Sequence, residues 1–490
     1  MRWPSRWLLG PLVFQVSKHS VLSSCYRPPP YMDANPLWTC KMDEIGCKEI
    51  VRRQMQCLIH DQVELPAQFQ EWLEEWIEIK RTVNPDEVLS KVAKVLLPRT
   101  PDHYWCVPAN KVSVSWVTDQ DDLLDELIRQ LSWFDRVHSL EWYRYGLNGQ
   151  LLSNEGWWSL VIRRVALEVL KARLDSDPVF YYRFFGPFVP LPGLSDCLFL
   201  YRRRRNWINP FYIYFYGVNM LRTWTGRRTY CEDLFHGQMA LLRPEFMYAS
   251  VQEVSHPTRE NVLVFHNSGD DFGNIPLPKI LNNYRWHSTP NRTFGRKSRL
   301  LTFMGTWDDG GLRKVRHVLI PVLRDALKKY MHVGKAGGER FLEEWSKSDF
   351  CLIPRGFRRR AFMESECLAL ADCVCVYIWD DFERLPYRDS PAHWSKLGMS
   401  LQMTSDLPNT LLDSLRSVTQ ADFERYRRNM RIYSESHYTF EGLLEQLFGF
   451  LTGGSSDLVC DQYLDPDEIA AMQNKATDLV RSWEDILNGR

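Results

Sequence analysis

The sequence of 490 residues lacks an excess of charge of either sign and lacks a long apolar run. It contains 61 lysine and arginine residues and 61 aspartate and glutamate residues. A balanced charge disfavours partners that are held by a general positive field, such as nucleic acids and anionic membranes. No segment reaches the roughly 20 apolar residues that a membrane-spanning helix needs. The length is sufficient for two or three domains with full cores.

Paired metal-ligand spacings are also missing, although the chain has 12 cysteines. No C-x-x-C pair is matched by a second pair, so we expect no zinc site and no other metal site. Four cysteines lie in or beside apolar runs, namely Cys351, Cys367, Cys373 and Cys375. We interpret these four as small buried hydrophobic side chains. A secretory location permits disulfides, but the sequence does not pair them.

Two apolar blocks are the most informative feature that is present. Ser348–Gly356 reads S-D-F-C-L-I-P-R-G, and Cys373–Tyr387 reads C-V-C-V-Y-I-W-D-D-F-E-R-L-P-Y. Each apolar run is typical of a buried strand and ends at turn-forming or acidic residues. The intervening segment 358–372 has the length of a crossover helix. This strand–loop–helix–strand pattern predicts a parallel sheet with a ligand at the carboxyl ends of its strands, and an Arg-Gly pair there indicates a phosphate group.

These blocks resemble the exostosin family of glycosyltransferases (glycosyltransferase family 47), as a divergent member. The family pattern is roughly S-x-F-C-L-x-P-x-G, an acidic helix, C-x-P-V and D-D-x-E-L-P-F. The matching residues are Phe350, Cys351, Leu352, Pro354, Gly356, Cys373, Val376, Asp380, Asp381, Glu383, Leu385, Pro386 and Tyr387. Residues 299–313 are similar to the family's strand–glycine–loop–arginine opening, and 411–440 to its C-terminal helices. The resemblance covers about residues 299–445.

The resemblance implies an α/β protein with a two-Rossmann, GT-B-like architecture. The C-terminal donor domain matches well, whereas the N-terminal half is shortened or rearranged, because too few residues separate Phe211 from the donor domain. The implied division is 1–35, a disordered or targeting segment; 36–205, a mixed helical region of unknown role; 206–298, a partial acceptor-side half; 299–455, the nucleotide-sugar donor domain; and 456–490, a C-terminal helix.

Several elements are predicted from apolar periodicity. Three strands, Leu300–Met304, Phe350–Ile353 and Val374–Ile378, should be neighbours or near neighbours in one parallel sheet. A helix is expected over 312–330, where Pro321 would kink or split it. Another is expected over 157–174. A C-terminal helix from Asp465 to Leu487 has a strong N-terminal signal in D-P-D-E, and it either crosses to brace the first domain or packs on its own domain.

A nucleotide-sugar transferase of this family must neutralise a diphosphate leaving group. Folds with two facing Rossmann domains do this with arginines and a helix N-terminus instead of a metal. The resemblance therefore implies a donor site made by Gly305, Arg313, Arg355, Gly356 and Arg360, and Arg316 on the helix after Gly305 is a further candidate. Arginine suits the role because its planar fork binds two phosphate oxygens. The alternative for each arginine is an exposed surface side chain.

The family's ribose-binding acid precedes the C-x-P-V cysteine by six residues. That position is Cys367 in this chain, and the nearest carboxylate is one residue earlier, at Glu366. Glu366 could bind the ribose if the turn after the helix carries one extra residue. Glu364 lies about one turn from Arg360, which favours an ion pair within the helix. The proline of C-x-P-V is replaced by Cys375.

Inverting transfer needs a base near the acceptor hydroxyl. A predicted strand, Val262–His266, runs into a loop that contains Asp270 and Asp271. We therefore predict His266, Asp270 and Asp271 as the catalytic candidates. A capping or turn role for each is the alternative.

The resulting hypothesis is transfer of a sugar from a nucleotide-sugar donor to a glycan or glycoprotein acceptor, with inversion and without a metal or other cofactor. The alternative is an inactive exostosin-like fold that binds or recruits a partner. The run Arg202–Arg205 is interpreted as a solvated turn, with a phosphate or polyanion contact as the alternative. No nucleic acid partner is expected, because the net charge is zero. Arg2 and Arg6 precede a short apolar segment, which favours a secretory address with possible membrane association. The exostosin resemblance implies the Golgi, and a cytoplasmic address is the alternative.

Overall fold

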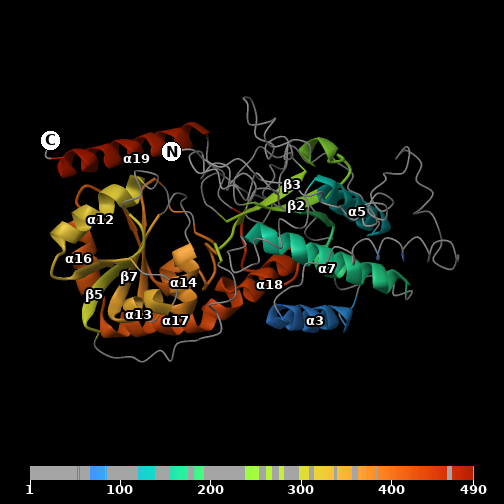
Figure 1. The fold of residues 1–490 in the computed structure, drawn as a ribbon, viewed down its shortest axis with the longest axis horizontal. Coiled ribbons are helices and arrows are strands. Elements are labelled where there is room, and N and C mark those ends of the chain that lie inside the picture. Colours follow the sequence, from blue (N-terminus) through green and yellow to red (C-terminus); the bar gives the residue numbers. More distant parts are fainter. Residues whose placement is uncertain are drawn as a thin grey trace, which may run out of the picture.

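The computed structural model describes the secondary-structure core of the chain. The described residues are 52, 55, 67–82, 84, 120–137, 154–174, 181–192, 238–252, 261–267, 275–280, 297–307, 314–335, 339–355, 362–371, 373–381, 383, 385–460 and 466–488. They form an α/β fold with two parallel, Rossmann-like sheets of four and five strands (Figure 1). In this part of the chain no helix combines the length and apolarity that crossing a membrane requires.

The five-stranded sheet is built from the apolar blocks of the C-terminal half. Its strands are β5 (Arg299–Met304), β6 (Met331–Gly334), β7 (Ser348–Pro354), β8 (Val374–Trp379) and β9 (Met399–Gln402). Their spatial order is β6-β5-β7-β8-β9, and every pairing is parallel. The prediction that the runs at 300–304, 350–353 and 374–378 are neighbouring strands is confirmed. Strands β7 and β8 are buried along almost their whole length because helices cover both faces.

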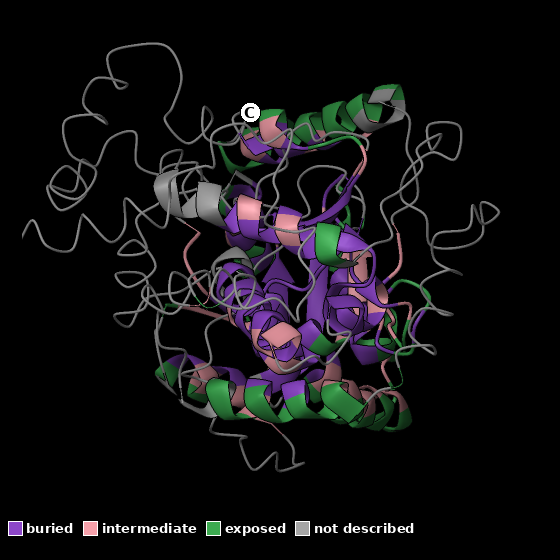
Figure 2. Ribbon diagram, turned by 90° about the vertical axis from the view of Figure 1, so that its right-hand side faces the viewer, coloured by how far each residue is buried: buried purple, intermediate pink, exposed green. Residues whose placement is uncertain are grey.

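Helices α12 (Lys314–Ala326) and α16 (Leu407–Ser417) lie on one side of this sheet. Helices α13 (Glu339–Ser346), α14 (Phe362–Leu370) and α17 (Gln420–Tyr438) lie on the other (Figure 1). Figure 2 shows the buried strands between helices whose outer faces are exposed. Helix α12 is shorter than predicted, because the chain leaves the helix after Ala326 to reach β6. Pro321 lies inside α12 without dividing it.

The four-stranded sheet collects residues from both sides of the predicted boundary at 205. Its strands are β1 (Phe188–Leu191), β2 (Met247–Gln252), β3 (Val262–His266) and β4 (Ile275–Pro276), in that spatial order and all parallel. Residue 205 therefore does not divide this sheet, because β1 pairs with β2. The predicted strand 262–266 is confirmed. The predicted helix 157–174 is confirmed as α7 (Asn154–Leu174).

The remaining helices of this half are α3 (Ala67–Thr82), α5 (Gln120–Val137) and α8 (Tyr181–Phe185). Helix α5 packs on β1, and α7 packs on β2. The hydroxyl of Tyr248 in β2 donates to Glu126 Oε1 of α5 at 2.8 Å. This bond satisfies a buried carboxylate inside the layer between helix and sheet. The prediction at Arg202–Arg205 lies outside the described residues.

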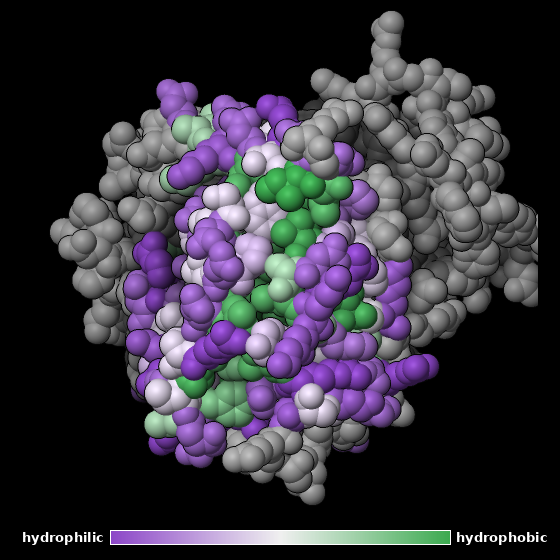
Figure 3. All heavy atoms as spheres, turned by 90° about the vertical axis from the view of Figure 1, so that its left-hand side faces the viewer, coloured by the Kyte–Doolittle hydropathy of each residue, from purple (hydrophilic) through white to green (hydrophobic). Residues whose placement is uncertain are grey.

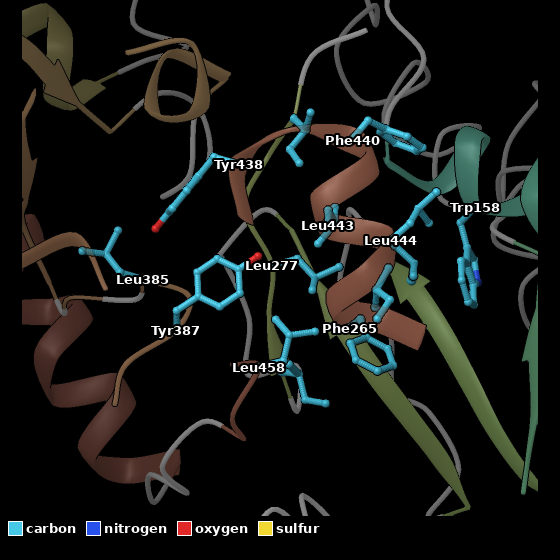
Figure 4. Close-up of a cluster of buried hydrophobic side chains, with 14 of the residues drawn as sticks. Trp158, Phe265, Leu277, Leu385, Tyr387, Tyr438, Phe440, Leu443, Leu444 and Leu458 are labelled. Atoms are coloured by element: carbon cyan, nitrogen blue, oxygen red, sulfur yellow. The ribbon is translucent and has the colours of Figure 1, made fainter. Parts of the chain in front are cut away.

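A helix from the C-terminal half completes the core of the N-terminal half. Helix α18 (Phe440–Leu451) follows α17 after a single residue, Thr439, whose side chain caps it. Phe448 of α18 stacks on Trp76, with ring centroids 4.3 Å apart, and Phe450 meets Phe265 at 5.6 Å. Figure 4 shows the apolar cluster that results around α18, with Phe265 of β3 from the smaller sheet and Leu385 and Tyr387 from the segment after β8. The two halves therefore share one core.

The C-terminal helix α19 (Pro466–Leu487) is confirmed, and it packs on α12 of its own half (Figure 1). Trp483 is its most buried side chain, at 1 % exposure. The bracing of the other half belongs instead to α18. The end of α19 exposes Ile486 and Leu487, and the face of the molecule on that side shows a band of apolar side chains between polar ones (Figure 3).

A polar network fixes the junction between α17 and α18. His437 Nε2 lies 2.8 Å from Asp457 Oδ2, which also accepts a bond from Ser390 Oγ at 2.8 Å. Because the carboxylate accepts, His437 donates from Nε2, and its Nδ1 accepts from Ser436 Oγ at 2.7 Å. Burial lowers the pKa of His437 below its ordinary value of 6.5, and the bond to Asp457 offsets only part of this effect.

This lowered pKa predicts a loss of stability on acidification. Below about pH 6.5 the unfolded chain takes up a proton at His437 more readily than the folded chain does, so the free energy of unfolding should fall, by at most about 1.4 kcal/mol per pH unit for one proton. His437→Gln, which keeps a donor toward Asp457, should flatten the profile between pH 6.5 and more acidic values in urea unfolding. The matched variant His317→Gln changes an exposed histidine and should keep the wild-type slope. Equal slopes for all three proteins would contradict the prediction.

Candidate functional site

The order of the five-stranded sheet creates a crevice between β5 and β7. Along the chain, β5 connects through α12 to β6 on one side, whereas β6 connects back past β5 to β7 on the other. The chain therefore leaves the carboxyl ends of β5 and β7 in opposite directions, and ligands of open α/β sheets bind at such a switch point. Gly305 follows β5 and Arg355 follows β7, so two of the predicted donor residues lie at this edge.

Gly305 lies in a narrow space. Its backbone N–H donates to Gly334 O at 3.0 Å, which extends the ladder of β5 and β6. A Cβ atom at this position would lie 3.1 Å from the ring of Phe303 and 3.8 Å from the sulfur of Met363. The first turn of α14 therefore approaches the end of β5. A small residue is favoured here because a side chain would press against the aromatic ring.

Arg355, one of two predicted phosphate-binding arginines within the described residues, is engaged by two carboxylates. Its guanidinium lies 2.7 and 3.0 Å from the two oxygens of Asp380 and 3.4 Å from Asp381 Oδ2. The Arg355 side chain is 18 % exposed, and the two acids are 5 % and 3 % exposed. The positive charge is thus largely neutralised by the residues that end β8. A phosphate ligand has to compete with this pair or share the guanidinium with it.

Arg316 links helix α12 to the end of β7. It lies in the first turn of α12 and is 5 % exposed. Its Nε donates to the carbonyls of Pro354 and Arg355 at 3.1 and 3.0 Å, and a terminal nitrogen donates to Pro354 O at 2.9 Å. These bonds hold the end of β7 against α12. Arg316, which the sequence also suggested as a phosphate ligand, therefore has a positioning role in this arrangement.

A cavity of about 420 Å³ opens beside Arg355, Asp380 and Asp381. Its other lining residues are Val315, Gln473, Ala476, Thr477, Val480, Arg481 and Glu484. Six of these belong to α19, so the C-terminal helix forms one wall of the cavity. The sequence does not predict this wall. The helical periodicity of α19 predicts that one face of the helix is buried, but it does not identify the part of the protein that covers that face.

Two disulfides lie directly beneath α14. Cys351 of β7 is bonded to Cys373, and Cys367 of α14 is bonded to Cys375 of β8. The interpretation of these cysteines as separate buried hydrophobic residues is therefore wrong. The second bond also joins two departures from the exostosin-like pattern, because Cys367 occupies the position of the acid and Cys375 that of the proline. The two departures from the pattern are therefore linked, because Cys367 and Cys375 form one disulfide.

Glu366 and Glu364 are both almost fully buried on α14, at 4 % and 0 % exposure. A buried carboxylate needs a cation or hydrogen-bond donors nearby. The ion pair predicted between Glu364 and Arg360 remains a prediction, because Arg360 lies outside the described residues. So do Arg313 and Gly356, which leaves Gly305, Arg316, Arg355 and Glu366 as the predicted donor residues whose positions are described.

His266 is the one catalytic candidate within the described residues, since Asp270 and Asp271 lie outside them. It ends β3 and is 1 % exposed, with Gln252 as its neighbour on β2. The next residue, Asn267, has no exposed surface, and within the described structure neither polar atom of its side chain has a hydrogen-bond partner. Gln252 Oε1 is also buried and has no hydrogen-bond partner within the described structure. The two amides lie at the carboxyl edge of the smaller sheet. The sequence does not predict this pair, because the residues come together only through the pairing of β2 and β3.

No protein-family model matches the sequence, and no curated protein matches it.

Proposed function

We propose that the protein transfers a sugar from a nucleotide-sugar donor to a glycan or glycoprotein acceptor, as a divergent exostosin-like enzyme with a GT-B arrangement of its two sheets. The observation that carries this proposal is the crevice between β5 and β7, with Gly305 and Arg355 at its edges and the 420 Å³ cavity beside it. The same edge holds the residues that carry the exostosin-like pattern. A nucleoside diphosphate suits this place because parallel sheets bind phosphates at their switch points.

In the proposed reaction the donor diphosphate is neutralised by arginines of the loops after β5 and β7. Arg355 is one of them, and the sequence places Arg313, Gly356 and Arg360 in the same loops. Glu366 would bind the ribose. A base at the carboxyl edge of the smaller sheet, His266 or one of Asp270 and Asp271, would take the proton of the acceptor hydroxyl as it attacks the sugar. Inversion follows from this single displacement, and no metal is assigned.

A secretory, Golgi location fits the proposal. The disulfides Cys351–Cys373 and Cys367–Cys375 support an oxidising compartment, because cytoplasmic thiols are normally kept reduced. A cytoplasmic protein remains the alternative.

A second function, binding or partner recruitment without catalysis, is favoured by two specific observations. Arg355 is held by Asp380 and Asp381, and the position of the ribose-binding acid is occupied by a disulfide cysteine, Cys367. Both features weaken the donor site that the resemblance implies.

A donor-turnover assay separates these functions. The full-length protein is incubated with a panel of nucleotide-sugars, with and without glycan acceptors, and free nucleoside diphosphate is measured. We expect turnover that persists in the presence of a chelator. His266→Ala should lower it by about 100-fold to 10,000-fold if His266 is the base, whereas the exposed-site control His317→Ala should not. Calorimetric binding of a nucleoside diphosphate without turnover would support the inactive module, and absence of both would reject the donor site.

A further inference from the structure

A second cavity, of about 370 Å³, lies between helix α17 and the segment that joins β8 to β9. This segment, called the loop below, includes the short helix α15 (Trp394–Leu397). It is lined by Arg388, Asp389, Ser390, Pro391, His393, Ser395, Lys396, Asn429 and Tyr433. None of these residues lines the cavity beside Arg355. The volume lies within the range of about 300–1,000 Å³ that is typical of small-ligand pockets. Neither the sequence pattern nor the proposed transfer reaction assigns a role to this place.

The loop that forms this cavity starts from a strained residue. Tyr387 has φ of +61°, a left-handed conformation that a bulky residue seldom adopts. Its side chain is fully buried, and its hydroxyl donates to His437 O at 2.8 Å. Its ring packs edge-on against His437 and Tyr438, at centroid distances of 4.9 and 5.5 Å. Such strain persists only where the surroundings enforce it, and it is concentrated at ligand clamps and active sites.

Further bonds hold the rest of the loop in one shape. Ser390 Oγ donates to Asp457 Oδ2 at 2.8 Å, and the Tyr438 hydroxyl donates to Ala392 O at 2.9 Å. Asn429 Nδ2 of α17 donates to Lys396 O, also at 2.9 Å. The loop is thus anchored at its start, middle and end before any ligand arrives, which lowers the entropy cost of binding.

This anchored loop presents two cations that no buried acid neutralises. Within the described structure the ammonium of Lys396 has neither a hydrogen bond nor an ion pair. Arg388 has one ion pair, with Asp389 at 3.7 Å, and these side chains are 48 % and 70 % exposed. An exposed pair of this length contributes little. Both cations therefore remain available to an anion, in contrast to Arg355.

The other polar groups around the cavity include further donors. The backbone N–H of Ser395 donates to His393 Nδ1 at 3.4 Å, so the proton of the neutral ring lies on Nε2. Burial lowers the pKa of His393, which keeps the ring neutral near pH 7. Tyr433 adds a hydroxyl group, whereas the Ser395 hydroxyl donates to His393 Nδ1 at 2.9 Å. Asp389 is the only acid among the lining residues.

We propose that this cavity binds a tetrahedral oxyanion, a phosphate or sulfate group, through Arg388 and Lys396. The guanidinium offers paired donors to two oxygens, and the ammonium acts as a compact charge beside them. The cavity is much larger than a single ion, so the group has room to be carried by a small polar molecule such as a sugar.

Isothermal titration calorimetry with the full-length protein tests this proposal. The four probes are inorganic phosphate, inorganic sulfate, glucose 6-phosphate and glucose 6-sulfate. At least one should bind to the wild type, and the double variant Arg388→Gln/Lys396→Gln should weaken that binding at least tenfold. Tighter binding of the esters identifies a sugar-borne group as the ligand, whereas equal binding identifies the free oxyanion; both results support the proposal.

A matched control removes the same charge elsewhere. Lys328→Gln/Lys475→Gln replaces two exposed lysines outside the cavity and should keep the wild-type affinity within about twofold. Arg388 and Lys396 are exposed, so their replacement is expected to preserve folding, which the melting temperature verifies. The proposal is overturned if no probe binds to the wild type, if the cavity variant keeps its affinity, or if the control loses as much.

Discussion

Replacing Cys351 and Cys373 together by alanine is expected to lower the free energy of unfolding by about 3 kcal/mol, and replacing Cys367 and Cys375 by about 2.5 kcal/mol. The first bond closes a loop with a sequence separation of 22 and the second a loop of 8, so the first constrains the unfolded chain more. The two loops overlap along the chain between Cys367 and Cys373, so their effects are not fully additive, and the variant without either bond should lose about 5 kcal/mol. A loss of this size is a large part of the total stability of a typical protein, about 5–15 kcal/mol.

Single replacements provide the control for this prediction. If Cys351 and Cys373 form a bond, Cys351→Ala alone already breaks it, and adding Cys373→Ala should change the urea midpoint little further. Two independent buried thiols would instead give losses that add. Additive losses, or a wild-type midpoint that a reducing agent leaves unchanged, would contradict the pairing. The same comparison applies to Cys367 and Cys375.

The strands around the crevice were predictable because their signal is local. The runs at 300–304, 350–353 and 374–378 are continuous and apolar, and a strand covered on both faces needs that composition. The tail helix was predictable for the same reason, since its N-terminal signal and its apolar stripe are both written within 22 residues. The prediction made the three strands neighbours or near neighbours, and the structure gives their order as β5-β7-β8.

The partners of these elements were not predictable from local patterns. Helix α18 reads as part of the donor half along the chain, yet Phe448 packs on Trp76, more than 350 residues earlier. Cys367 and Cys375 read as two separate changes to a pattern, although they form one bond. Each case depends on a contact between two different elements, α18 with α3 and α14 with β8. The periodicity of a segment predicts which of its faces is buried but not which element covers that face.

In the candidate site, too, the sequence predicts individual residues but not the contacts between them. The chemistry of Arg355 and Gly305 was visible in the sequence because turn residues follow buried strands. The carboxylates that hold Arg355 were also visible as the end of the next strand, but their pairing depends on the register of β7 and β8, in which Pro354 lies beside Ile378. Asp380 therefore reaches the guanidinium, and the question becomes whether Arg355 binds a ligand or only its two acids.

Arg355→Met alone is expected to destabilise the fold by about 3–5 kcal/mol, because Asp380 and Asp381 are then buried without their cation. The two acids are 5 % and 3 % exposed, so water does little to replace the guanidinium. The triple variant Arg355→Met/Asp380→Asn/Asp381→Asn removes the charges together and should recover most of this loss in urea unfolding. A triple variant as unstable as Arg355→Met would show that the ion pair is not the source of the effect.

Nucleoside-diphosphate affinity in the same variants then decides the role of Arg355. If the guanidinium binds the diphosphate, the triple variant should regain stability but still bind at least tenfold more weakly, a loss of about 1.5–3 kcal/mol for a charge-assisted contact. Asp380→Asn/Asp381→Asn with Arg355 intact is the matched control, and it should bind at least as tightly as the wild type because its guanidinium is released from both carboxylates. If instead the triple variant and this control bind equally well, Arg355 serves only the ion pair, and the phosphate site must be sought among the other arginines of the two loops.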